Sequence, residues 1–155
     1  MEQLQSLNKI LFYGNKGLLR GQTTEIRSII NRIVRDHQLY IGVLEFNIID
    51  DDGLLEINQS QLKHDYYTDI ITFDYCFDKY VEGDIYISED RVKDNAKTFG
   101  YAPKEELARV VFHGVLHLCG YKDKKKADQK IMRDREDYYL KLLKRSTGNT
   151  KKNVR

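Results

Sequence analysis

Residues 107–123 read LARVVFHGVLHLCGYKD, and this stretch decides much of the fold. Apolar residues occupy most positions up to residue 118, which is typical of a helix buried in a protein core. Two histidines, His113 and His117, interrupt the apolar run four positions apart. Because residues i and i+4 lie on the same face of a helix, both imidazoles are expected to face a common point.

A third group can reach that point from beyond the helix. Gly120 is suited to end the helix, because glycine readily adopts the left-handed conformation common there. The chain can then turn back and bring Asp123 to the histidines. Burying two histidines without partners would cost roughly 1–3 kcal/mol for each unsatisfied group. We therefore predict a metal site at His113, His117 and Asp123, the ligand set of a catalytic zinc site with an open position.

Two other readings of the histidine pair are weaker. A structural zinc site normally has four protein ligands, often thiolates, but Cys119 lies roughly 200° around the helix from His117. Zinc proteases of the H-E-x-x-H type place a glutamate after the first histidine as general base. Here Gly114 stands in that place. The pattern therefore favours metal-dependent chemistry other than peptide hydrolysis by that route.

Length and composition bound the rest. The chain has 155 residues, of which 41% are hydrophobic and 32% are charged, and fits one soluble domain. We assign residues 1–146 to this domain and residues 147–155 to a basic, flexible tail. No apolar run approaches the length of a membrane span, and the N-terminus lacks the pattern of a secretory signal. The two cysteines have no C-x-x-C spacing, so the expected location is the cytoplasm.

Charge is unevenly distributed along the chain. Residues 1–121 carry 13 Lys and Arg against 19 Asp and Glu, a net −6, whereas residues 122–155 carry 13 against 5, a net +8. A basic end on an acidic body suits a polyanion such as nucleic acid. A solvated helix followed by a frayed tail is the alternative.

The pattern of apolar residues and capping signals predicts an α+β domain: about four strands in a mixed sheet packed against about five helices. The metal site lies at the end of its buried central helix. Ser88 is expected to cap one helix, and Pro103 to begin the helix that carries the histidines. The apolar stripe of the last helix is assigned to Ile131, Tyr138, Tyr139, Leu142 and Leu143. The expected strands are residues 8–14, 39–49, 68–73 and 83–88, and the expected helices are residues 23–38, 88–99, 103–118 and 127–145. Residues 54–63 fit a short helix slightly better than a strand.

Three segments resemble the YbeY endoribonucleases, the rRNA maturation factors of bacteria. The family signature H-G-x-L-H-L-x-G-Y-D-H is similar to H-G-V-L-H-L-C-G-Y-K-D at residues 113–123. Residues 68–73 (TDIITF) resemble the family strand T-D-V-L-S-F, and residues 83–88 (GDIYIS) resemble G-D-I-x-I-S. The likeness covers roughly residues 40–140.

The resemblance implies that His113 and His117 bind one Zn²⁺ or another divalent ion, with Asp123 in place of the third histidine. It also implies an arginine before the T-D-V-L-S-F strand, but no arginine occurs between Leu54 and Lys79. Lys63 is the candidate for the phosphate contact, with His64 and Arg109 beside the site. Asp74 replaces the proline that usually follows that strand.

The function implied is a zinc-dependent, single-strand-specific endoribonuclease that matures the 3′ end of small-subunit rRNA and serves ribosome quality control. The expected partners are rRNA and the small ribosomal subunit, with no DNA and no membrane. Tyr66 and Tyr67 are candidates for base stacking, and Asp69 and Asp84 for supporting roles. Two alternatives stay open: an RNA-binding assembly factor with a mainly structural metal, and a metal-dependent hydrolase of another substrate. The general base and the oligomeric state are not identified.

Overall fold

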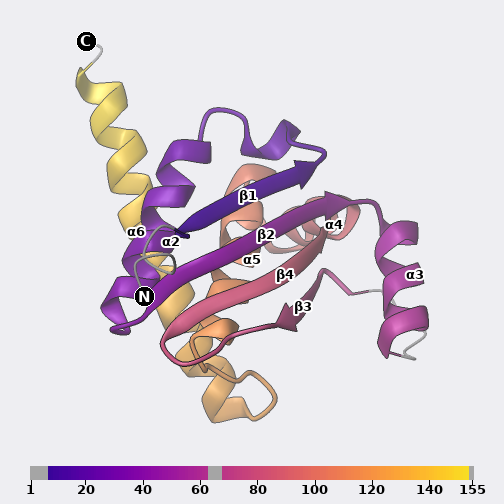
Figure 1. The fold of residues 1–155 in the computed structure, drawn as a ribbon. Helices are drawn as coiled ribbons and strands as arrows, with labels where there is room; N and C mark the ends of the chain where they lie inside the picture. Colours follow the sequence, from indigo (N-terminus) through magenta and orange to yellow (C-terminus); the bar gives the residue numbers. More distant parts are fainter. Residues whose placement is uncertain (1–6, 63–67, 154–155) are drawn as a thin grey trace.

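The computed structural model describes residues 7–62 and 68–153, and its centre is a four-stranded mixed sheet (Figure 1). The strand order is β1-β2-β4-β3. The strands β1 (Lys9–Gly14), β2 (Tyr40–Ile49) and β4 (Tyr80–Ser88) are parallel, and β3 (Ile70–Asp74) pairs antiparallel with β4. The predicted α+β class and mixed sheet are confirmed.

Helices cover one face of this sheet. Burial alternates along β2 and β4, so Phe46 and Ile85 are fully buried whereas Glu45 and Asp84 lie on the open face. Alternation of this kind marks a sheet with a single covered face. The covering helices include α2 (Thr23–Asp36) and α5 (Pro103–Leu118), and α5 lies behind the sheet in Figure 1. The last helix, α6 (Lys126–Asn153), packs against α2 and α5.

The central helix is α5, as the apolar run predicts. It packs against β3, β4, α2, α4 and α6, and 11 of its 16 residues are buried. Gly114 allows this close approach to the sheet. A Cβ at this position would lie 3.0 Å from Ile70 Cδ1 and 3.3 Å from Ile85 Cδ1. The glycine of the H-G pair therefore keeps the histidine-bearing helix close to β3 and β4.

The predicted helix boundaries at α4 and α5 are confirmed. Ser88 caps α4 (Glu89–Phe99), and its hydroxyl accepts a 3.1 Å hydrogen bond from the backbone N–H of Arg91. Pro103 occupies the first turn of α5. Gly120, with a φ of +110°, turns the chain just past the helix end.

Other boundaries differ from the predicted ones. The helix expected at residues 54–63 is α3 (Asp51–Leu62), which begins inside the acidic run because Asp51 and Asp52 suit the positive end of the helix dipole. The last helix does not end at residue 145, since α6 continues to Asn153. Its predicted stripe was partly wrong. Ile131 and Tyr138 are exposed, while Met132 and Leu140 are buried beside Tyr139 and Leu143.

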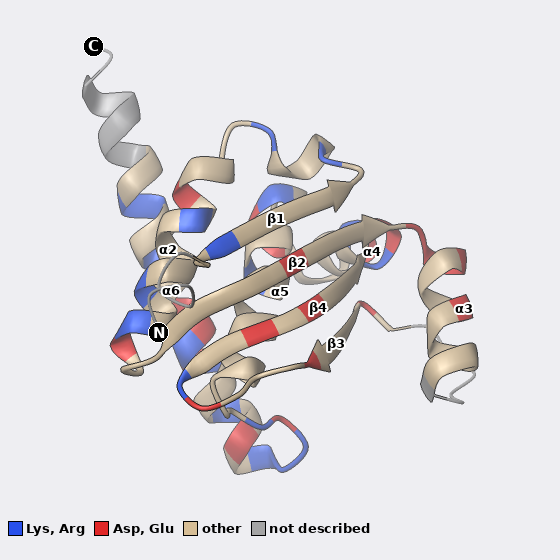
Figure 2. Cartoon of the chain, viewed as in Figure 1, with Lys and Arg blue, Asp and Glu red and all other residues tan. Residues whose placement is uncertain are grey.

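Charges are distributed unevenly over the molecule (Figure 2). Basic residues concentrate along α6 and the bend that precedes it, whereas acidic residues lie on β2, β4 and α3. Among the residues described, no helix combines the length and apolar character needed to cross a membrane.

Candidate metal centre

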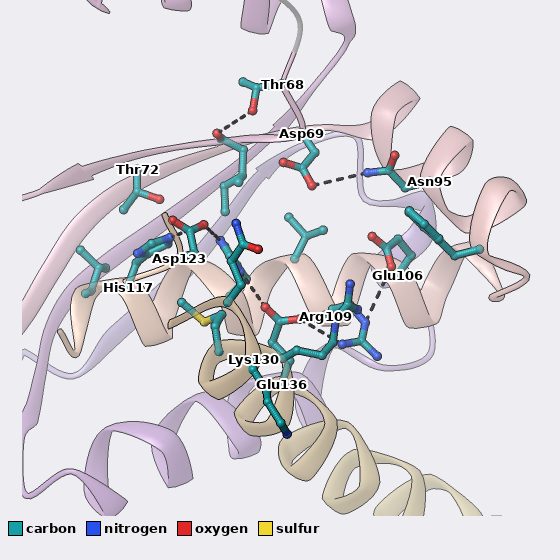
Figure 3. Close-up of a pocket in the computed structure, with 18 of the residues that line it drawn as sticks. Thr68, Asp69, Thr72, Asn95, Glu106, Arg109, His117, Asp123, Lys130 and Glu136 are labelled. Atoms are coloured by element: carbon teal, nitrogen blue, oxygen red, sulfur yellow. Dashed lines mark hydrogen bonds and ion pairs between the residues drawn. The ribbon is translucent and has the colours of Figure 1, made fainter. Parts of the chain in front are cut away.

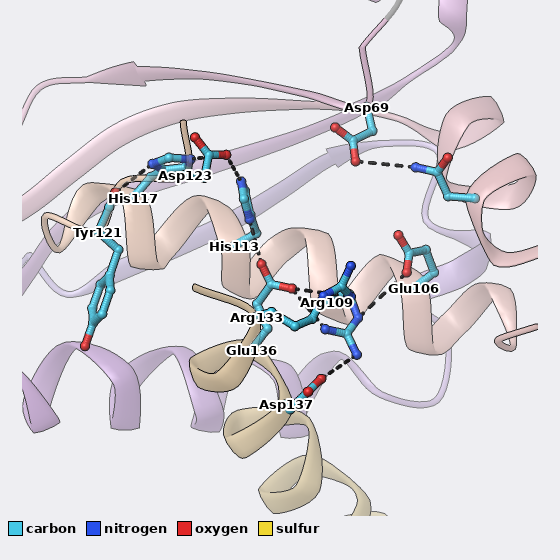
Figure 4. Close-up of polar contacts among 11 residues, drawn as sticks. Asp69, Glu106, Arg109, His113, His117, Tyr121, Asp123, Arg133, Glu136 and Asp137 are labelled. Carbon is cyan, nitrogen blue, oxygen red and sulfur yellow. Dashed lines mark hydrogen bonds and ion pairs between the residues drawn. The ribbon is translucent and has the colours of Figure 1, made fainter. Parts of the chain in front are cut away.

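The structure brings His113, His117 and Asp123 together at the C-terminal end of α5. The two imidazoles are 4.6 Å apart between ring centroids and nearly perpendicular. The Nε2 atoms of His113 and His117 each lie 3.2 Å from the same oxygen, Oδ2 of Asp123. One ligand atom from each residue lies within 4.8 Å of the others. The three residues singled out in the sequence therefore converge on one point (Figure 4).

Each imidazole is oriented through its other nitrogen. His113 Nδ1 donates a 2.7 Å hydrogen bond to Oε2 of Glu136, and His117 Nδ1 donates a 2.9 Å bond to the backbone carbonyl of Tyr121. Both partners accept hydrogen bonds, so the Nδ1 atoms carry the protons and the Nε2 lone pairs face Asp123. With neutral imidazoles, two lone pairs and a carboxylate oxygen meet at one point and repel one another, and either a proton or a metal cation between them removes that repulsion. The donor set therefore fits a divalent metal ion.

Glu136 is a site residue that the sequence analysis missed. It lies on α6, is 5% exposed, and also accepts a 3.0 Å hydrogen bond from Arg109. Burial lowers the pKa of His113, but the hydrogen bond and charge of Glu136 outweigh it, so that pKa is raised above its usual value. A signal was present in the sequence, because Glu136 falls in helical register with Met132 and Tyr139 on the buried face of α6.

His37 supports the same centre from a distance. Its Nδ1 donates to the carbonyl of Ile33 at 2.6 Å, so its Nε2 accepts a 2.7 Å hydrogen bond from the Tyr121 hydroxyl. The backbone carbonyl of Tyr121 is the acceptor for His117. The end of α2 therefore fixes the turn that orients His117.

The converging residues line a cavity of about 1100 Å³ between β3, α4, α5 and α6 (Figure 3). Asp69 and Glu106 also line it, from opposite sides. The pKa of Glu106 is raised to about 7, chiefly by burial and also by the charge of Asp69, while the charge of Arg109 opposes the rise. Burial likewise raises the pKa of Asp69, and His113 opposes that shift. The cavity thus joins a cation-binding point to carboxyl groups that hold protons unusually tightly.

Arg109 lines the cavity beside the metal ligands, where the sequence analysis placed it. It is 7% exposed and is held by Glu136 at 3.0 Å and by Asp137 at 2.8 Å, so its charge is already balanced by these carboxylates. Asp84 lies on β4 outside the lining of the cavity, whereas Asp69 contributes to that lining. Lys63, His64, Tyr66 and Tyr67 lie outside the described residues, so their predicted roles are untested.

The cysteines remain outside the metal centre. Burial raises the pKa of Cys119 to about 12 and that of Cys76 to about 11. Metal ligation requires the thiolate, so these environments disfavour it. Within the described part of the chain, the group able to hold a metal ion contains His113, His117 and Asp123.

A family model and the curated relatives both assign this chain to the same protein family. A family model for Endoribonuclease YbeY matches residues 16–144. Proteins named Endoribonuclease YbeY are similar to this chain: that of Flavobacterium psychrophilum is 47% identical over 125 residues, covering 81% of this chain and 89% of its own. That of Cytophaga hutchinsonii is 48% identical over 124 residues, covering 79% of this chain and 87% of its own. The solution structure of TM1509 from Thermotoga maritima superposes with a TM-score of 0.66 at 26% identity, covering 94% and 93%.

Proposed function

Because this chain belongs to the YbeY endoribonuclease family, we propose that it hydrolyses RNA at one divalent metal ion bound by His113, His117 and Asp123. The enzyme is an endoribonuclease of rRNA processing. The proposal concerns its metal, its ligands and its substrate. The observation that carries it is the convergence of two Nε2 atoms on one carboxylate oxygen, each at 3.2 Å.

The chain's own residues prepare this point for a cation. Glu136 and the Tyr121 carbonyl hold each imidazole by its Nδ1, which leaves the Nε2 lone pair directed at the ion. Asp123 adds a negative charge that partly neutralises the ion. With three protein ligands, coordination positions stay available for solvent and a phosphate oxygen. A divalent ion there supplies Lewis acidity, which polarises the phosphate and acidifies water.

We propose zinc as this ion, since imidazole and carboxylate ligands in a three-ligand set suit it. Asp123 in place of a third histidine also suits harder ions such as Mn²⁺, because carboxylates are ligands that those ions prefer. Metal analysis of protein purified without added metal, followed by add-back of single ions, decides between them.

The proposed substrate is unpaired rRNA at the 3′ end of the small ribosomal subunit, with ribosome quality control in the cytoplasm as the wider role. The metal ligands line an open cavity of about 1100 Å³. Unpaired RNA can reach them through this cavity, which supports a single-stranded substrate. Lys63 is proposed to contact phosphate. Changing Lys63 to Gln should weaken RNA binding and reduce its salt dependence by roughly one phosphate contact.

A chelator titration tests the proposal against a structural metal. We expect the metal-free protein to keep its circular dichroism spectrum and lose cleavage of a single-stranded rRNA fragment, and Zn²⁺ to restore cleavage. The same fragment as duplex RNA or as DNA is expected to resist. Loss of the fold with the metal would indicate a structural ion, and RNA binding without cleavage at any metal would indicate an assembly factor.

A further inference from the structure

The cavity extends beyond the metal ligands to a second end that the proposed hydrolysis does not use. We name this the distal end and define it by Asn95 and Phe99 on α4, Glu106 on α5 and Arg133 on α6. Because α5 packs against both α4 and α6, it forms the floor between two walls. Figure 3 shows Glu106 on the floor, with Asn95 on one side and α6 on the other.

One wall of the distal end presents an aromatic ring to solvent. Phe99 is the last residue of α4, is 62% exposed, and lines the cavity one turn after Asn95. A single exposed apolar side chain on a convex surface is ordinary. A phenyl ring exposed in a polar cavity that Arg133 also lines instead offers, together with that guanidinium, flat surfaces on which planar groups stack.

The floor of the distal end contains polar groups with incomplete partners. The Glu106 side chain is 7% exposed, and its ion pair with Arg109 Nε spans 3.9 Å, too long for a hydrogen bond. Arg109 Nε is itself buried without a hydrogen-bond partner among the described residues. Asn95 lines the same cavity and reaches Asp69 only at 3.5 Å. Buried polar groups left in this state favour a ligand that brings its own donors and acceptors.

An unpaired nucleobase has the properties that these walls and floor require. Its two faces are flat and stack on aromatic rings and guanidinium groups, and its edge carries donors and acceptors. We propose that the distal end is a subsite for one unpaired base of the RNA substrate, stacked between Phe99 and Arg133 with its edge at Asn95 and Glu106. This inference rests on the proposed endoribonuclease function, and it adds which residues hold a base of the RNA strand beside the metal site.

The proposal is tested by combining a protein change with a substrate change. The substrate is a fluorescent single-stranded rRNA oligonucleotide whose bases near the cleaved linkage are removed one at a time, leaving abasic riboses. Binding to the zinc-loaded protein is measured by anisotropy, with a non-hydrolysable phosphonate at the cleaved linkage. We expect Phe99→Ala to weaken binding about tenfold. Removal of one particular base should weaken wild-type binding similarly but leave binding to Phe99→Ala unchanged.

Two controls separate stacking from general damage. Phe99→Trp should retain wild-type affinity, because it keeps an aromatic face. Tyr13→Ala removes an aromatic side chain that is 45% exposed on β1, away from the cavity, and should not change binding. The subsite would be overturned if Phe99→Ala bound RNA with wild-type affinity. It would also be overturned if the affinity loss from Phe99→Ala added to the loss from base removal at every position. Absence of cleavage by the wild-type protein would refute the proposed function, whereas anisotropy with the oligonucleotide and its abasic forms, made without the phosphonate, would still decide the subsite.

Discussion

Glu136 and His113 are 23 positions apart in the chain, yet Oε2 of the first accepts a 2.7 Å hydrogen bond from Nδ1 of the second. Glu136 also accepts from Arg109, which is held by Asp137 as well. This arrangement couples α6 to the metal-facing edge of α5 through a single buried carboxylate (Figure 4). The orientation of one metal ligand therefore depends on the docking of α6.

Glu136→Gln is expected to weaken Zn²⁺ binding 10- to 100-fold, because the neutral amide no longer raises the basicity of His113. Isothermal titration with Zn²⁺ measures this loss. Asp134→Asn is the matched control on the same helix, since Asp134 is exposed and pairs with Lys130. Equal affinities in the two variants would contradict the role assigned to Glu136.

His117→Ala is expected to remove nearly all bound metal, because it leaves only two protein ligands at the site. Cys119→Ala, two positions further along, should leave the metal content at the wild-type value, since the Cys119 thiol stays protonated at neutral pH. Elemental analysis of the purified variants provides the measurement. A similar metal loss in both variants would refute the ligand assignment.

The free energy of unfolding of the metal-free protein should depend on pH through the ionisation of Glu106. Burial raises its pKa from 4.5 to about 7, so the folded state binds this proton more tightly than the unfolded state. The contribution of Glu106 to the free energy of unfolding therefore falls as pH rises from 4.5 to about 7. The loss is at most about 3.5 kcal/mol, since the pKa differs by about 2.5 units and one unit corresponds to about 1.4 kcal/mol.

Urea unfolding of Glu106→Gln at pH 5 and pH 8 tests this effect. The variant should match the wild type at pH 5 and be more stable than it at pH 8, because Gln cannot ionise. Glu105→Gln is the control on the neighbouring position, where the side chain instead pairs with Lys144. A difference between wild type and Glu106→Gln that does not change with pH would show that Glu106 ionises normally.

Removal of the residues after Ser146 should weaken RNA binding in a salt-dependent way. The deleted segment contains Lys151, Lys152 and Arg155, and α6 extends to Asn153, so part of this charge continues the basic helix. Three lost phosphate contacts would reduce the slope of log affinity against log salt by about 2. Anisotropy across a salt series measures the slope. An unchanged affinity for RNA at low salt would show that these residues are a solvated end of the chain that does not contribute to RNA binding.

The local features of the fold could be read from sequence. Helical geometry alone places His113 and His117 on one face, and Gly120 and Asp123 follow within six positions of His117. The metal ligands could therefore be predicted from a short segment. Ser88 and Pro103 mark helix starts because capping and first-turn preferences act within a few residues. The resemblance to a known family covers the same segments, and the match at residues 16–144 extends it.

What the sequence determined by itself was a pair of imidazoles on a buried helix and a carboxylate able to reach them. Only the tertiary structure decided which groups orient and surround them. Glu136, His37 and the distal end join segments far apart in the chain, and such contacts depend on how helices pack rather than on local periodicity. The same packing placed Arg109 in a buried ion-pair network, where its charge is neutralised by carboxylates that sequence distance alone does not reveal.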